Sequence, residues 1–279
     1  MPAFGRSCQG WAGPGPLRSA PRAGIAQSNA QGRSSLRARA HERAARRYAL
    51  GMTGANDDDR ARERRAMVRE IEADARATAS LTGRASFGAR VMAAMAKVPR
   101  HRFVPAAWSQ SAYQNRPLPI DAGQTISQPY IVALSTDLID PEPDDVVLEV
   151  GTGSGYQAAV LAELVREVRS IEVIESLGTE AAQRLRELGY DNVHVKIGDG
   201  HKGWPEHGPY DGIVVTAAAI DIPQALVDQL RPGGRMVIPV GPRFAEQELV
   251  LLEKRADGRV GQRTVLPVRF VPMTRGEDR

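Results

Sequence analysis

Between residues 57 and 140, apolar side chains recur every three to four positions, which is the period of an amphipathic helix. Met67 and Ile71 form one such stripe, and Val91 and Met95 form a second on a stretch that ends before a proline. Pro129 suits the first turn of a third helix, where the missing N–H of proline costs no hydrogen bond. The pattern predicts helices over residues 57–78, 87–98 and 127–139, with a loop over 114–127.

After residue 141, short apolar runs alternate with helix-like stretches, an order typical of a parallel sheet covered by helices on both faces. Only a short turn at Asp257 and Gly258 joins the last two runs, so we expect these to pair as an antiparallel hairpin. The predicted fold class is α/β: a doubly wound, mostly parallel, Rossmann-like sheet with N-terminal helices and a C-terminal antiparallel hairpin. Strands are predicted over 146–150, 168–174, 193–197, 212–215, 235–240, 248–252 and 264–271, and helices over 155–165, 179–188 and 223–230.

The first 56 residues differ in composition from the rest of the chain. They hold nine arginines and one glutamate and are rich in alanine, glycine, serine and proline, with almost no large aliphatic side chains. Such a segment buries too little apolar surface to offset its ordering entropy, so we predict a disordered tail over 1–56 and a single domain over 57–279. An organellar transit peptide has a similar composition, and a true start at Met52 or Met67 would remove the tail. These alternatives stay open.

Charge and cysteine content argue against several function classes. The tail carries a net charge of +8 and the whole chain +4, so residues 57–279 carry −4 and lack the basic balance of a nucleic-acid-binding protein. The single cysteine, Cys8, argues against a disulfide framework, a cysteine-ligated zinc site and a cysteine nucleophile in the folded part. No run approaches the roughly 18 consecutive apolar residues of a membrane span. We therefore expect a cytoplasmic protein with no metal and no nucleic-acid or membrane partner.

A glycine-rich turn follows the first predicted strand, where residues 146–155 read Val-Val-Leu-Glu-Val-Gly-Thr-Gly-Ser-Gly. The glycines let a ligand approach the backbone, and the helix that follows offers free N–H groups. A dinucleotide site has the pattern G-x-G-x-x-G, but Tyr156 stands at its last position. The observed spacing instead suits S-adenosylmethionine, whose cationic sulfonium needs a nearby acid rather than an anion cradle. The candidate cofactor residues in this turn are Gly151, Thr152, Gly153 and Gly155.

Two acidic residues follow the next two predicted strands. Glu172 lies about 20 residues after the turn, where a carboxylate can accept both ribose hydroxyls of a nucleoside. Asp199 and Gly200 follow the third strand, where they would accept from an adenine amino group and let the ring approach. Because the carboxyl ends of parallel strands meet at one edge of a sheet, we expect these residues to share one site with the glycine turn.

Several segments together resemble a known family. Tyr113-Gln-Asn-Arg-Pro-Leu-Pro-Ile-Asp-Ala-Gly-Gln-Thr-Ile-Ser-Gln-Pro-Tyr130 closely resembles the segment before the cofactor loop in protein-L-isoaspartate O-methyltransferases. The run from Val147 to Gln157 is similar to the cofactor loop of that family, and the resemblance covers roughly residues 65–275. Residues 57–140 would then be the N-terminal helical and substrate-cleft segment, and 141–279 the cofactor-binding sheet. Shorter similar segments lie at 198–200, 214–218, 230–234 and 268–273.

The resemblance implies an enzyme that uses S-adenosylmethionine to methylate the free carboxyl of L-isoaspartyl and D-aspartyl residues in damaged proteins and peptides, which initiates their repair. It implies a catalytic role for Ser127. The family usually has glycine where Asp121 stands, which puts substrate affinity in question; if that position needs a positive φ angle, aspartate tolerates it better than most residues. The residues that the resemblance places beside the cofactor in the methyl-transfer cleft are Gln124, Thr125, Ile126 and Thr274.

The implied chemistry fits the residues present. An α-carboxyl group has a pKa of about 3.5 and is ionised near pH 7, so its methylation needs no general base. Ser127 would orient the carboxylate; the alternative is that Ser127 only caps the helix predicted to begin there. Three rival functions stay open: another methyltransferase acting on a nucleic acid or small molecule, an NAD(P)-dependent oxidoreductase, and a non-catalytic binding protein. We expect the protein to act as a monomer on isoaspartyl-containing proteins and peptides.

Overall fold

The computed structural model describes residues 60–243 and 245–275. These residues belong to one compact unit. The tail predicted over residues 1–56, including Cys8, lies outside the described residues, as does the start of the helix predicted from residue 57.

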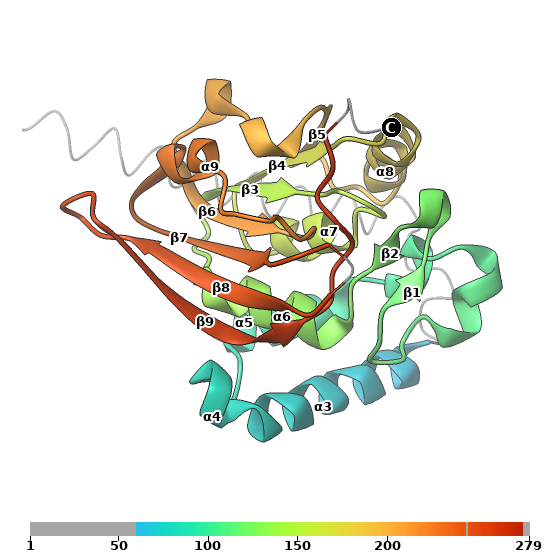
Figure 1. The fold of residues 1–279 in the computed structure, drawn as a ribbon. Coiled ribbons are helices and arrows are strands. Elements are labelled where there is room, and N and C mark those ends of the chain that lie inside the picture. Colours follow the sequence, from blue (N-terminus) through green and yellow to red (C-terminus); the bar gives the residue numbers. More distant parts are fainter. Residues whose placement is uncertain (1–59, 244, 276–279) are drawn as a thin grey trace, which may run out of the picture. The chain divides into compact units, whose positions relative to one another are not determined.

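A seven-stranded sheet lies at the centre of the described structure (Figure 1). Its strand order is β5-β4-β3-β6-β7-β8-β9; the pairs from β5 to β7 are parallel, and β8 pairs antiparallel with both β7 and β9. The predicted α/β fold class and the C-terminal hairpin are confirmed. The strands are β3 (Val146–Val150), β4 (Glu167–Glu172), β5 (Val193–Ile197), β6 (Tyr210–Val215), β7 (Leu230–Val240), β8 (Gln247–Lys254) and β9 (Val260–Val268).

Strand β3 has β4 on one side and β6 on the other. The chain runs from β3 through α7 (Tyr156–Ala162) to β4, and β6 joins the opposite side of β3 later in the sequence. The carboxyl end of β3 is therefore a topological switch point, the place where open α/β sheets bind ligands. Since the glycine turn follows β3 directly, the sheet topology puts that turn at the crevice.

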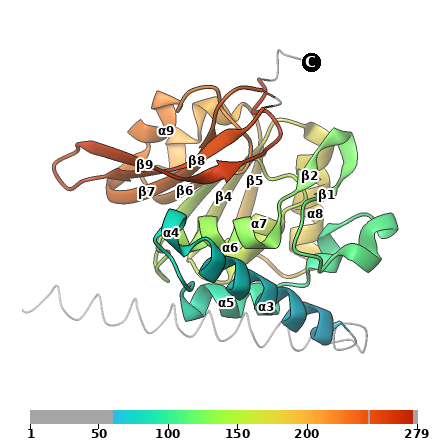
Figure 2. The same cartoon turned by 60° about the horizontal axis from the view of Figure 1, so that its bottom comes forward.

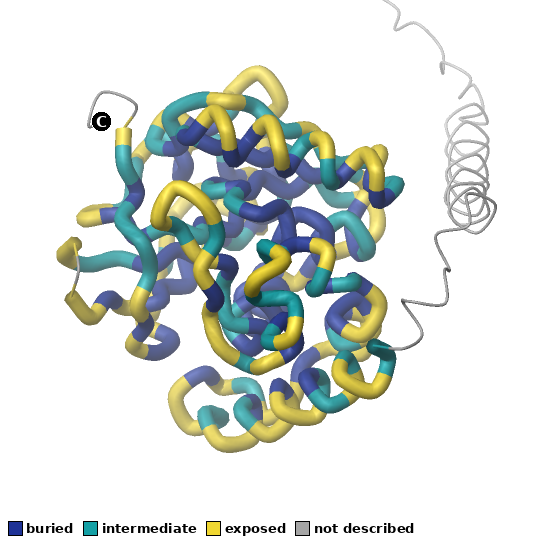
Figure 3. Tube along the Cα trace, turned by 90° about the vertical axis from the view of Figure 1, so that its right-hand side faces the viewer, coloured by how far each residue is buried: buried dark blue, intermediate teal, exposed yellow. Residues whose placement is uncertain are grey.

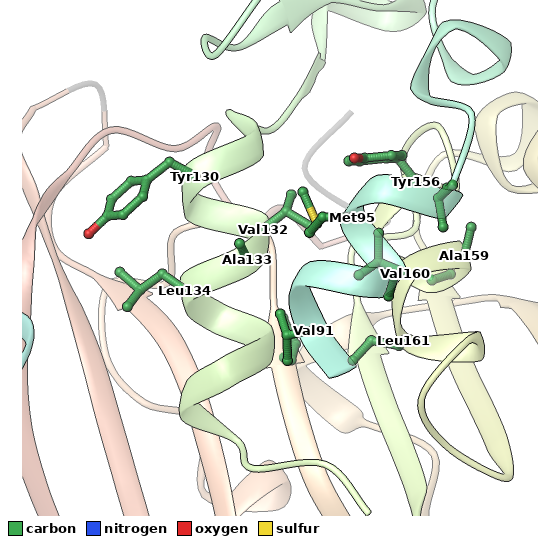
Figure 4. Packing of buried hydrophobic residues seen from close by; sticks show 14 of the residues in the cluster. Val91, Met95, Tyr130, Val132, Ala133, Leu134, Tyr156, Ala159, Val160 and Leu161 are labelled. Atoms are coloured by element: carbon green, nitrogen blue, oxygen red, sulfur yellow. The ribbon is translucent and has the colours of Figure 1, made fainter. Parts of the chain in front are cut away.

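Apolar side chains on the two faces of the sheet form two hydrophobic clusters. Val147 of β3 packs with residues of the N-terminal helices, whereas the next residue, Leu148, belongs to the cluster that includes α9. The alternation follows from the strand geometry, because successive side chains point to opposite faces. Figure 4 shows Val91 and Met95 among the buried side chains of α6 and α7. Besides α7, the helices are α3 (Ala61–Ala77), α4 (Ala79–Thr82), α5 (Ala89–Lys97), α6 (Pro129–Leu138), α8 (Glu175–Glu187) and α9 (Gln224–Asp228).

The helices before the sheet agree with the apolar pattern. Met67, Ile71 and Ala75 are buried along one side of α3, at the spacing of one helical turn. Helix α5 ends at Lys97, two residues before Pro99, and α6 begins at Pro129. In Figure 2, α3, α5 and α6 lie together on one side of the sheet, so the N-terminal part of the domain covers that face.

Several regions differ from the sequence prediction. Helix α8 begins at Glu175 rather than at residue 179, and β9 spans Val260–Val268 rather than 264–271. The segment 114–127 contains a small antiparallel pair, β1 (Leu118–Pro119) with β2 (Thr125–Ile126), joined by a turn over Asp121–Gly123. Leu118 and Ile126 are partners and both are buried. Strands of two residues are too short to show an alternating pattern, which is why a loop was predicted. Strand β7 begins at Leu230 rather than at residue 235, and its pairing with β6 shifts register there.

Exposed residues lie mainly on the outer sides of the helices and in the turns, as Figure 3 shows. Within residues 60–243 and 245–275, no helix combines the length and apolar character needed to cross a membrane. The same part of the chain holds no group of three or more His, Cys, Asp or Glu side chains that could bind a metal ion.

Candidate functional site

The glycine turn after β3 takes backbone conformations that favour glycine. Gly151 has a φ angle of 97°, and a Cβ atom built there would lie 2.4 Å from Thr216 Oγ1. Gly155 has a φ angle of 87°, and its Cβ would lie 3.1 Å from Leu185 Cδ1 of α8. Positive φ angles are costly for residues with a Cβ, so glycine is needed here for both conformation and packing. The turn is thus held tightly against β6 and α8.

A cavity that opens to solvent lies at the carboxyl ends of β3 and β4; the space not filled by atoms, with the solvent at its mouth included, is about 770 Å³. Its wall includes the segment around β2, the glycine turn and the stretch after β9, together with the carboxyl ends of β3 and β4 and the residues that follow β5 and β6. Their approach brings together ten of the twelve residues that the sequence singled out. The lining includes Gln124, Thr125, Ile126, Ser127, Gly151, Thr152, Gly153, Glu172, Gly200 and Thr274.

Gly155 and Asp199 do not line this cavity. Gly155 lies behind the turn against α8, as its contact with Leu185 shows. The Asp199 carboxylate accepts the backbone N–H of His201 at 2.9 Å and lies 2.9 Å from Nδ1 of the same residue. Its neighbour Gly200 does lie in the wall, with no room for a Cβ beside Val150. The structure therefore supports Gly200 as a cavity residue more directly than Asp199.

Glu172 fastens the glycine turn to β4. One carboxylate oxygen accepts the backbone N–H of Gly153 at 2.8 Å, and the other accepts that of Ile174 at 3.0 Å. The residue is only 5% exposed. A carboxylate can accept about four hydrogen bonds, so Glu172 can still accept hydroxyls from a ligand in the cavity.

Ser127 does not cap α6. The residue before that helix is Gln128, so the capping interpretation of Ser127 is wrong. In the described part of the chain the Ser127 hydroxyl has no hydrogen-bond partner, although it lines the cavity. Thr125 and Ser127 also line a second, more open groove, whose lining includes Asp74 and Arg269. The two spaces therefore meet at Ser127.

The structure shows whether position 121 needs the positive φ angle that would favour glycine. Among the residues of this turn, the positive φ angles fall on Ala122 (54°) and Gly123 (68°), not on Asp121. Asp121 is exposed and is not among the cavity residues. Its backbone therefore does not require glycine, and its charge faces solvent.

A buried acid in the cavity was missed by the sequence analysis. Glu149 of β3 is fully buried and lines the cavity, and burial raises the pKa of its carboxyl to about 8. The Ser170 hydroxyl donates to Glu149, and the Thr152 and Ser170 hydroxyls lie 2.6 Å apart. The available signal was an acidic residue inside the apolar run 146–150, where a buried strand normally has none.

The charges of the cavity suit a cationic ligand. Its lining contains two acids, Glu172 and the mostly protonated Glu149, and none of the lining residues is Lys, Arg or His. It also contains no cysteine and no pair of groups arranged for nucleophilic catalysis. Chemistry in this cavity would thus depend on orienting ligands and excluding water.

Comparison with known proteins gives consistent matches. Residues 82–278 match the family model described as protein-L-isoaspartate(D-aspartate) O-methyltransferase. The chain is 61% identical over 226 residues to protein-L-isoaspartate O-methyltransferase 2 of Syntrophobacter fumaroxidans, which covers 81% of this chain and 92% of that protein. It is 62% identical over 208 residues to the enzyme of the same name from Polaromonas sp., covering 75% of this chain and 99% of that protein.

Solved structures agree with these matches. A structure named protein-L-isoaspartate O-methyltransferase superposes with a TM-score of 0.66 at 26% identity, covering 76% of this chain and 66% of that one. A Plasmodium falciparum structure named for the same activity, in complex with S-adenosyl-L-homocysteine, has a TM-score of 0.58 at 24% identity and covers 67% and 91%. The similarity to the Plasmodium falciparum structure supports the fold assignment only.

Proposed function

The chain belongs to the protein-L-isoaspartate(D-aspartate) O-methyltransferase family, and we propose that the cavity at the carboxyl ends of β3 and β4 is where it methylates its substrates. The enzyme transfers a methyl group from S-adenosylmethionine to the free carboxyl of isoaspartyl residues in damaged proteins and peptides. One observation carries the assignment of the site: the segment Gln124–Ser127 forms one wall of the cavity and the glycine turn forms another.

The residues of the cavity fit S-adenosylmethionine. When bound, this cofactor supplies an electrophilic methyl group on a positively charged sulfur. Glu172 is the acidic lining residue that favours a cation, because the raised pKa of Glu149 leaves that carboxyl mostly protonated near pH 7. Glu172 holds the Gly153 N–H and keeps acceptor capacity for ribose hydroxyls, and Gly200 lies in the cavity wall. Thr152 is assigned to the cofactor by its place in the glycine turn and Asp199 by its place after β5, whereas the assignment of Thr274 rests on the resemblance.

Ser127 is proposed to orient the acceptor. Its hydroxyl has no partner among the described residues, so it can donate to an incoming carboxylate without breaking another hydrogen bond. The carboxylate is already ionised near pH 7, so no residue needs to remove a proton. The rate gain then comes from holding the carboxylate oxygen in line with the methyl group and from excluding water. The open groove that meets the cavity at Ser127 would hold the substrate chain.

We further propose that the enzyme acts as a monomer and needs neither nucleic acid nor membrane. The net charge of −4 on residues 57–279 supports the absence of a nucleic-acid partner. A cytoplasmic location stays a prediction from the sequence.

The test is a methylation assay with labelled S-adenosylmethionine and two matched peptides, one with isoaspartate and one with aspartate at the same position. We expect base-labile methyl incorporation into the isoaspartyl peptide alone. Incorporation into both peptides alike, or cofactor binding without any incorporation, would contradict the proposed function. The second result would favour a binding protein that retains the fold.

A further inference from the structure

A buried arginine contacts both Tyr156, which follows the glycine turn, and the backbone of the segment that leads to β1. Arg100 lies in the short 3-10 helix after α5 and is 0% exposed. We infer that Arg100 is a positioning residue, which holds the substrate-cleft segment and the cofactor turn in fixed register through contacts on both. The inference rests on the proposed function, because it concerns the geometry of that same reaction.

On the cofactor side, the guanidinium of Arg100 lies over the ring of Tyr156, with Cζ 4.9 Å from the ring centroid. Tyr156 is the first residue of α7, directly after the glycine turn, and it lines the cavity. The ring is 1% exposed and also contacts the Phe103 ring edge-on at 5.6 Å. A guanidinium on an aromatic face is attracted by the ring, more strongly when both are removed from water. Arg100 therefore contacts Tyr156, the residue that directly follows the glycine turn.

On the substrate side, Arg100 holds the chain that leads into the cleft segment. Its Nε donates to the carbonyl of Ala112 at 2.8 Å, and Nη2 donates to that of Arg116 at 3.3 Å. Between these two carbonyls lies Asn115, whose side-chain oxygen accepts the backbone N–H of Tyr130 at 2.9 Å. Tyr130 is in the first turn of α6, three residues after the proposed catalytic serine. A continuous series of contacts therefore runs from the glycine turn to the start of α6.

Burying the charged guanidinium of Arg100 costs free energy, which indicates that the placement of this group matters to the protein. In residues 60–243 and 245–275 no carboxylate forms an ion pair with Arg100, and its Nη1 atom has no hydrogen-bond partner there. Desolvation lowers the pKa of Arg100 to about 10, so it remains charged near pH 7. An apolar side chain of similar size would avoid the desolvation penalty. An apolar side chain, however, can neither place a cation over the Tyr156 ring nor donate to the carbonyls of Ala112 and Arg116, as the guanidinium does.

The experiment uses the full chain with Arg100→Lys, Arg100→Met and the control Phe103→Leu. Phe103 contacts the same Tyr156 ring but makes no hydrogen bond to the 112–116 segment. For each variant we would measure kcat and KM for an isoaspartyl peptide, the Kd of S-adenosylmethionine by calorimetry, and the melting temperature. Activity is compared well below the lowest melting temperature.

Both Arg100 variants should lower kcat by roughly 10- to 100-fold, because small misplacements of reacting groups cost this much. The Kd of S-adenosylmethionine should change by less than about threefold, since each wall stays folded. Phe103→Leu should lower the melting temperature and change kcat by less than about threefold. Wild-type kcat in Arg100→Lys would overturn the inference, and so would equal losses of kcat in Arg100→Met and Phe103→Leu.

A double-mutant cycle keeps the inference testable if Arg100→Met does not fold. Arg100→Lys combined with Asn115→Ala should lose little more kcat than the worse single variant, because both changes break the same series of contacts. Fully additive losses would contradict it. Failure of the wild-type enzyme to methylate the isoaspartyl peptide would instead refute the proposed function, so the two failures are distinguishable.

Discussion

Replacing Glu149 by glutamine is expected to remove a pH dependence of stability. The carboxyl is fully buried in β3, and burial raises its pKa to about 8, whereas in the unfolded chain it ionises near 4.5. Between these pH values the folded protein keeps a proton that the unfolded chain has released. The free energy of unfolding therefore falls as the pH rises through this window. At about 1.4 kcal/mol for each pKa unit, the total loss has an upper limit of about 5 kcal/mol.

The measurement is urea unfolding of the cofactor-free wild type and of Glu149→Gln at several values from about pH 5 to about pH 9. Glutamine keeps the size of the side chain and can accept from Ser170, but it does not ionise. The two proteins should be similarly stable at the acid end, and the variant should be more stable by several kcal/mol at the alkaline end.

A matched control is Glu253→Gln on β8, whose exposed carboxylate pairs with Arg235 at 3.0 Å. An exposed ion pair contributes about 0–1 kcal/mol, so this change should leave the slope against pH nearly as in the wild type. A stability difference between wild type and Glu149→Gln that stays constant over the whole pH range would refute the argument from burial.

Three further changes have definite expected outcomes. Ser127→Ala should lower kcat by roughly 10- to 100-fold while the calorimetric Kd of S-adenosylmethionine changes little; equal losses in both would contradict the orienting role. Gly151→Ala should destabilise the protein by about 1–3 kcal/mol in urea unfolding, because a Cβ would lie 2.4 Å from Thr216 Oγ1 at a φ of 97°; unchanged stability would show that the turn can relax. Asp121→Gly should lower the peptide KM by about twofold at most, since the exposed charge is screened, and a tenfold decrease would place Asp121 at the substrate.

Local sequence patterns determined most of the elements and the candidate site. The apolar run Val146–Val150 is β3 with the predicted bounds, and Val193–Ile197 is likewise β5. The glycine turn and Glu172 come together because they lie at the carboxyl ends of the neighbouring parallel strands β3 and β4, and the alternation of elements predicts a parallel sheet. These features depend on residues close together in the chain, so a single sequence carries their signal.

Tertiary structure alone decided the features that depend on distant residues. Glu149 has a raised pKa because strands and helices from other parts of the chain exclude water around it. The short pair of β1 with β2 forms from two-residue strands that carry no periodic pattern of their own. The side chain of Arg100 meets Tyr156 across 56 positions of sequence, and no local propensity encodes that meeting. Burial, pKa and contact across the chain are set by packing, which exists only once the elements have assembled.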